Sequence, residues 1–331
     1  MKTLMTIFGQ PLTLYGALTA LALLVFWCVA ALYLKKRKVT GGKTLAFAVC
    51  TAVTGWLLAR VVFVACNAAY YIDELDGLWT PALYFRDGGY AMTGLILGLA
   101  AGAAVAALLS GVKPALMLNA AGLAAPAGIT VLRLAEFFCD TPASGDVGEG
   151  KYLEGIEWLD GLLTRLGLTM QADGDAVYPA CLAGAAAALV IFIALLVWQL
   201  ASRKEPAGAD VLTVFLLLYG AGQLVLEQLR DDGHLVFHFV HLQQIVALVF
   251  MLAALLVWTL RFRRAGVKKR TLPVVWIVSL VCIGLAVWAC FGIDRWENKL
   301  LAWLLLIVPT AIVTGAALFL RRAANYLTGE E

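Results

Sequence analysis

The stretch "LTLYGALTALALLVFWCVAALYLKKRK" (residues 12–38) decides how the rest of this chain is interpreted. Residues 12–34 contain no charged side chain, and about 20 apolar residues suffice to cross a bilayer as a helix. The basic cluster 35–38 follows the apolar run, whereas a signal peptide carries its basic residues first and has a shorter apolar core. The stretch therefore predicts a membrane-spanning helix rather than a cleaved leader.

The composition extends this expectation to the whole chain. Of the 331 residues, 62% are hydrophobic and only 14% are charged, whereas soluble domains average about 25% charged residues. In an apolar layer every backbone hydrogen bond must close within its own segment, so helices are expected and the alternating pattern of a membrane barrel is absent. We predict an all-α polytopic helical bundle of about nine transmembrane helices. The predicted spans are 12–34, 44–66, 90–109, 115–135, 178–200, 210–229, 241–260, 273–293 and 299–320.

The charges of the loops predict the orientation. Positively charged loops stay in the cytoplasm. Placing the cluster 35–38 inside assigns 16 of the 25 Lys and Arg residues to inner loops. The outer loops then hold most of the acidic residues. We therefore predict an N-out/C-in topology, and the net charge of +3 reflects the inner loops. It gives no reason to expect nucleic acid as a partner.

Two hydrophilic segments organise the chain. The outer segment 136–177 contains the amphipathic run 152–168, which predicts a small external helical cap over the spans. The inner linker 261–273 carries six basic residues and is expected to contact anionic lipid headgroups. We divide the chain into a seven-span membrane domain (1–260) and a C-terminal part (261–331) with the linker and two extra spans.

Ionisable residues within the predicted spans are the candidates for function, because they are costly there. Arg60, Arg133 and Glu227 all fall toward the outer ends of their spans. Helical steps of three and four also place Gln223, Glu227 and Arg230 on one face, and Arg133 and Glu136 on another. One interpretation is that these are snorkelling side chains and a satisfied ion pair. The other is a cationic pocket for an anion such as a phosphate.

The three histidines of the chain lie at 234, 238 and 241. Their spacing permits a zinc site or a solvated belt at the membrane interface. No acid follows in the HExxH manner, and the segment crosses an expected loop. No metal ion or cofactor is therefore assigned.

Five segments, in order, resemble the prolipoprotein diacylglyceryl transferase family over about residues 1–260. They include the Tyr-Gly pair at Tyr15 and the arginine of "ARVVFVACNAAYYIDE" at Arg60. The other three are "DGGYAMTGLILG" (87–98), "VLRLAEFFCD" (131–140), and "YGAGQLVLEQLRDD" followed by "HLQQIVAL" (219–248). The last two predicted spans lie beyond the family's usual seven.

The resemblance matches some of the family's site residues and departs at others. Tyr15, Arg60, Arg133, Glu227 and Arg230 match. The family's histidine in the Gly-Gly stretch aligns with Thr93, its asparagine after the arginine with Glu136, and its arginine in the sixth span with Gln223.

The resemblance implies transfer of a diacylglyceryl group from phosphatidylglycerol to the lipobox cysteine thiol of a prolipoprotein signal peptide. The expected location is the outer leaflet side of the bacterial inner (cytoplasmic) membrane, with the chain crossing it many times and in contact with membrane lipids. The product is a thioether, so a thiolate attacks carbon and a glycerol phosphate leaves. This chemistry requires a cation for the leaving phosphate and a base for the thiol.

The candidate catalytic residues are Arg133, Glu227 and Glu136. Arg133 would stabilise the phosphate, and either carboxylate could accept the thiol proton, since Thr93 cannot. Glu227 could instead only orient Arg230, and Glu136 could neutralise Arg133. The candidate phospholipid-binding residues are Arg133, Arg60, Gln223, Arg230, Tyr15 and Thr93. A non-catalytic paralogue that binds lipid or lipoprotein, and a small transporter, remain the alternatives.

Overall fold

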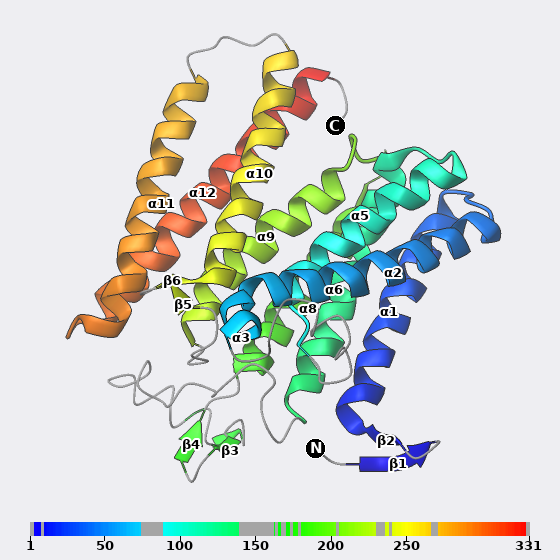
Figure 1. Cartoon of the computed structure of the whole chain (residues 1–331). Coiled ribbons are helices and arrows are strands. Elements are labelled where there is room, and N and C mark those ends of the chain that lie inside the picture. The colour runs from blue at the N-terminus through cyan, green and yellow to red at the C-terminus, as the bar shows by residue number, and fades with distance from the viewer. Residues whose placement is uncertain are drawn as a thin grey trace.

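The computed structural model is a bundle of long helices (Figure 1). It describes residues 3–7, 10–73, 89–138, 162, 165–166, 170–172, 175–177, 180–202, 205–229, 236–237, 240–265 and 271–328. Within these residues, nine helices are long and apolar enough to cross a membrane. They are α1 (Leu14–Lys36), α2 (Gly41–Cys66), α5 (Met92–Ser110), α6 (Pro114–Glu136), α8 (Ala180–Ala201), α9 (Asp210–Leu226), α10 (Leu242–Arg264), α11 (Thr271–Arg295) and α12 (Lys299–Thr328). The predicted all-α polytopic membrane protein is confirmed.

The remaining described elements are short. They are the helix α3 (Ala68–Asp73), the 3-10 turn η3 (Glu227–Leu229), and three antiparallel hairpins. The hairpins pair β1 (Thr3–Ile7) with β2 (Gln10–Thr13), β3 (Met170–Ala172) with β4 (Asp175–Val177), and β5 (Val236–Phe237) with β6 (Val240–His241). These hairpins lie outside the nine long helices. The amphipathic run 152–168, predicted as an external cap, lies mostly outside the described residues and stays a prediction.

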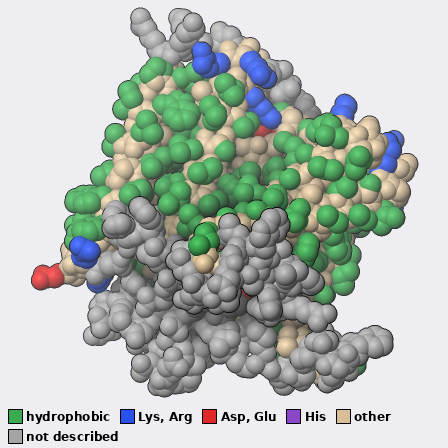
Figure 2. Space-filling model, viewed as in Figure 1, with side chains coloured by type: hydrophobic (Ala, Val, Ile, Leu, Met, Phe, Trp, Pro, Cys, Tyr) green, Lys and Arg blue, Asp and Glu red, His purple; other side chains and the backbone are tan. Residues whose placement is uncertain are grey.

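The surface of the bundle is apolar around its middle. In Figure 2, a broad band of hydrophobic side chains covers the visible face, and Lys and Arg gather mostly at its upper edge. Leu108 and Leu109 on α5 are more than 70% exposed, which is favourable only in contact with lipid. The turn between α1 and α2 lies at the same end of the bundle as the start of α9, and Arg37 pairs there with Glu205 at 3.2 Å. The N-out/C-in orientation of this arrangement stays a prediction.

Close packing of α6 and of the α2–α5 pair forms the centre of the fold. Helix α6 packs against α1, α5, α8 and α9, and its buried residues are mostly alanine and glycine. On α5, a Cβ added at Gly98 would lie 2.4 Å from the Thr54 carbonyl oxygen of α2. Small residues at these positions therefore let the helix backbones approach each other closely.

A buried network fixes the C-terminal helices to the bundle at the basic end. Asp210, at the start of α9, is fully buried. Its carboxylate accepts hydrogen bonds from Arg261 at 2.6 Å, Arg321 at 2.8 Å and Trp258 at 2.9 Å. Asn325 lies 3.4 Å from the same carboxylate. Helix α12 thus binds α9 directly, and it also packs against α10 and α11. The division of the chain at residue 260 stays a prediction.

Candidate functional site

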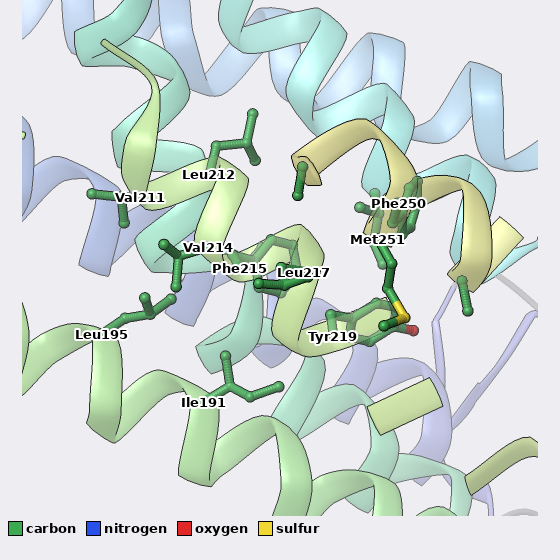
Figure 3. Packing of buried hydrophobic residues seen from close by; sticks show 14 of the residues in the cluster. Ile191, Leu195, Val211, Leu212, Val214, Phe215, Leu217, Tyr219, Phe250 and Met251 are labelled. Carbon is green, nitrogen blue, oxygen red and sulfur yellow. The ribbon is translucent and has the colours of Figure 1, made fainter. Parts of the chain in front are cut away.

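A cluster of polar side chains lies at the end of the bundle opposite the basic loops. Helices α6 and α9 end there, and α8 and α10 begin there. Figure 3 shows how apolar side chains of α9, among them Phe215 and Leu217, lie between α8 and α10. The packing fixes the end of α9, and with it the polar residues that follow. The cluster consists of Arg133, Glu136, Tyr219, Gln223, Glu227 and His241.

Arg133 is buried in the last turn of α6 and pairs with Glu136. Its Nη1 atom lies 2.8 Å and 3.0 Å from the two carboxylate oxygens. Both hydrogen bonds to Glu136 use the same nitrogen, so they do not involve Nε or Nη2 of Arg133. The absent side chain of Gly184 on α8 leaves room there, because an added Cβ would lie 3.5 Å from the Arg133 Nε. The ion pair expected from the sequence spacing is present, and it occupies only part of the arginine.

Tyr219 places a hydroxyl group next to this arginine. The residue is 6% exposed, and its ring packs at 5.6 Å from the ring of Phe215 (Figure 3). It is close enough to Arg133 and Glu227 for electrostatic interaction. The nearest cation to its hydroxyl is the Arg133 guanidinium. A buried hydroxyl beside an arginine forms a pair of donors that suits a ligand oxygen.

Glu227 follows α9 directly and is 1% exposed. The Gln223 amide, one helical turn earlier, donates a hydrogen bond to its Oε2. The same amide nitrogen lies 3.3 Å from Oε1 of Gln243 on α10. The predicted shared face of Gln223 and Glu227 is therefore confirmed. Arg230, the third residue of that predicted face, lies outside the described residues.

His241, directly before α10, faces the other oxygen of this carboxylate. Its Nδ1 lies 3.8 Å from Glu227 Oε1. That nitrogen is buried, and the His241 side chain also faces the backbone N–H of Gln244 in a capping box at the start of α10. The sequence analysis did not connect the two residues, because a loop separates them and helical spacing does not extend across a loop. His234 and His238 lie outside the described residues, so the zinc and interfacial-belt interpretations stay open.

Arg60 and Thr93 belong to the neighbouring α2–α5 pair. The Arg60 guanidinium donates to the Gly89 carbonyl at 2.9 Å and lies 5.7 Å from the centre of the Tyr90 ring. Both Arg60 and Thr93 are buried at the same end of the bundle as Arg133. The common depth expected for Arg60, Arg133 and Glu227 is thus present, and a shared pocket stays a prediction.

Tyr15 lies in the first turn of α1, which packs against α6. Its side chain is partly buried, and its carbonyl accepts a hydrogen bond from the Thr19 hydroxyl at 2.9 Å. A role of Tyr15 in binding phospholipid stays a prediction.

The cluster combines donors and acceptors in a medium of low polarity. Arg133 and Tyr219 can donate hydrogen bonds to an anion, Gln223 already donates to Glu227 and Gln243, and Glu227 and His241 can exchange a proton. Electrostatic interactions are stronger away from bulk water, so a preorganised set of this kind can stabilise developing charge. Within the described residues, no group of three or more His, Cys, Asp or Glu side chains could hold a metal ion.

Comparisons with known proteins agree on one family. The family model described as prolipoprotein diacylglyceryl transferase matches residues 2–260. Two similar proteins are named phosphatidylglycerol–prolipoprotein diacylglyceryl transferase. The one from Clostridioides difficile is 24% identical over 76% of this chain and 91% of its own length. The one from Streptococcus equi subsp. zooepidemicus is 25% identical over 78% and 95%, respectively. The family match ends before α11, so α11 and α12 lie beyond it.

Proposed function

Because the chain belongs to the prolipoprotein diacylglyceryl transferase family, we propose that it transfers the diacylglyceryl group of phosphatidylglycerol to a prolipoprotein. The acceptor is the thiol of the lipobox cysteine in the signal peptide. One observation carries the proposal: the Arg133 guanidinium, which contacts Glu136 through Nη1, lies beside the Tyr219 hydroxyl in a buried site. An amphiphilic anion such as phosphatidylglycerol reaches a membrane-embedded site of this kind from the lipid layer.

Arg133 is the residue proposed to bind the phosphate. In the reaction a sulfur–carbon bond forms, the bond between glyceryl carbon and phosphate oxygen breaks, and the electron pair leaves with glycerol phosphate. The planar donor fork of an arginine suits phosphate oxygens, and Tyr219 adds a neutral donor. Charge develops on the phosphate as the bond breaks, so these donors stabilise the transition state more than the bound lipid.

The remaining candidates have supporting roles in this proposal. Gln223 donates a hydrogen bond without charge where relatives of the family carry an arginine. Glu136 orients Arg133, and Glu227 takes part in accepting the proton of the thiol. Arg60, Thr93, Tyr15 and Arg230 contact the phospholipid from the surrounding segments. The site opens toward the outer leaflet of a bacterial inner membrane, because the basic loops lie at the opposite end of the bundle.

The test is a labelling assay with the purified full chain in vesicles. Phosphatidylglycerol with labelled acyl chains is the donor, and a peptide with a lipobox cysteine is the acceptor. We expect Arg133→Ala to reduce labelling at least 100-fold, because removing one such donor costs about 3 kcal/mol of barrier. Arg322→Ala is the matched control, since Arg322 is exposed at the basic end. Labelling that survives in a folded Arg133→Ala protein would exclude this site.

A second candidate function has its own supporting observation. Glu136 neutralises the charge of Arg133, and Thr93 stands where a histidine is expected. Both features suit a protein that binds lipid or a lipoprotein precursor without catalysis. In that case the wild-type protein would retain phosphatidylglycerol through purification, and Arg133→Ala would release it, while neither protein would label the peptide.

A further inference from the structure

We propose that His241, supported by Glu227, accepts the proton of the attacking thiol. This inference rests on the transfer reaction proposed above and adds a catalytic residue to it. The evidence is the arrangement of the two side chains: Nδ1 of His241 lies 3.8 Å from Oε1 of Glu227. That distance is too long for a hydrogen bond and short enough for an ion pair. Hydrogen bonds between catalytic groups often tighten only when the substrate is bound.

The burial of the pair shows which nitrogen would take the proton. The Glu227 side chain is 2% exposed and the His241 side chain 16% exposed. Nδ1 is buried, so the exposed part of the ring lies away from that nitrogen. Nδ1 therefore faces the carboxylate, and Nε2 is the nitrogen that a substrate can reach. A carboxylate in this position orients the ring and stabilises its protonated form.

Both members of the pair are held in place by neighbouring groups. The Gln223 amide donates to Oε2 of Glu227, and Oε1 is the oxygen that lies nearest the imidazole. The backbone N–H of His241 donates to the Gln244 side chain at 3.1 Å. Gln244 is fully buried, and its amide nitrogen lies 3.3 Å from the Leu224 carbonyl on α9. The junction of α9 and α10 thus fixes the distance between the carboxylate and the ring.

A histidine suits the proton transfer better than the carboxylates considered from the sequence. Histidine is the side chain that most often serves as a general base, because its ring can both accept and donate a proton. Thiol reactions need the thiolate, which is a minor form of a free cysteine at neutral pH. Thr93 cannot accept a proton, and Glu136 already pairs with Arg133. His241 is therefore the better base among the described residues of this cluster.

In the complete step, each bond that breaks is matched by one that forms. Nε2 of His241 takes the proton as the S–H bond breaks, and the imidazolium is stabilised by Glu227. The thiolate attacks the glyceryl carbon, the sulfur–carbon bond forms, and the carbon–oxygen bond to the phosphate breaks. The electron pair leaves on the glycerol phosphate, which Arg133 holds. The imidazolium proton then passes to that phosphate or to water, and His241 returns to its neutral form.

The test compares a cysteine peptide with the same peptide carrying selenocysteine. A selenol is already ionised at neutral pH and needs no base. His241→Asn retains a side chain that suits a helix N-cap position. We expect this variant to label the cysteine peptide about 100-fold or more slowly than wild type. The same variant should label the selenocysteine peptide less than about 10-fold more slowly than the wild type does, since only proton removal is affected.

Three outcomes would overturn the proposal. Equal losses with both peptides would mean that His241 only supports the structure, and an unchanged rate with cysteine would mean that it takes no part. His234→Asn and His238→Asn are the matched controls, expected to label the cysteine peptide at the wild-type rate. Similar losses in all three variants would instead point to a shared metal site. Failure of the wild-type protein to label either peptide would refute the transfer reaction itself, which distinguishes the two proposals.

Discussion

At the scale of single residues, Gln223 allows a test of the proposed site, because the resemblance aligns it with an arginine of the family. Its amide donates to Glu227 and lies near Gln243. We expect Gln223→Arg to keep the contact with Glu227, because an arginine can donate to the same carboxylate with added charge. Labelling of the lipobox peptide should stay at or above the wild-type rate, by up to about 10-fold, if residue 223 faces the phosphate. A lower rate in a folded Gln223→Arg protein would show that the amide itself is required.

The same residues show what local spacing reveals. The contacts of Gln223 with Glu227 and of Arg133 with Glu136 follow from helical steps of four and three, so the sequence predicts them. The approach of His241 to Glu227 does not follow from any period, because it depends on how α10 packs on α9 after a loop. The position of the Tyr219 hydroxyl beside Arg133 likewise depends on how α9 packs on α6.

At the scale of elements, the contact between α2 and α5 depends on glycine. We expect Gly98→Ala to destabilise the protein by about 1–3 kcal/mol, because its Cβ would lie 2.4 Å from the Thr54 carbonyl oxygen. The measurement is thermal unfolding in detergent. Gly284→Ala on α11 is the matched control, since a Cβ there meets nothing within 4 Å. Equal unfolding temperatures for the two variants would contradict this packing.

The helices themselves are the part of the fold that the sequence predicts best. Apolar runs set their number and approximate ends, because backbone groups inside a membrane must be satisfied within each segment. The sequence does not predict which helices contact each other. The glycines of α5 allow close approach, but their spacing does not say that α2 is the partner. That choice depends on the shapes of both surfaces together.

At the scale of the whole molecule, Asp210 joins the C-terminal helices to the family-like bundle. The sequence analysis did not single it out, although a carboxylate that opens an apolar run is a signal for a buried partner. Its partners Arg261 and Arg321 lie 51 and 111 residues further along the chain. No local pattern connects such distant positions. The network therefore became visible only in the folded arrangement of α9, α10 and α12.

The Asp210 network allows the division of the chain at residue 260 to be tested. Asp210→Asn removes the charge that faces Arg261 and Arg321, and breaking a buried pair costs about 3 kcal/mol or more. Glu205→Gln is the control, because the Glu205 side chain is 73% exposed and its pair with Arg37 is worth at most about 1 kcal/mol. Thermal unfolding in detergent measures both variants.

The form of the unfolding curve then decides how the two parts of the chain are related. If α11 and α12 are an integral layer of the bundle, Asp210→Asn should unfold in one transition at a lower temperature. If residues 261–331 form a separable unit, two transitions should appear, and the first should leave the transfer site intact. We expect the single transition, because α12 contacts α9 and α10 as well as α11. Damage at Asp210 would then reach the site at the other end through α9, whose far end places Gln223 and Glu227.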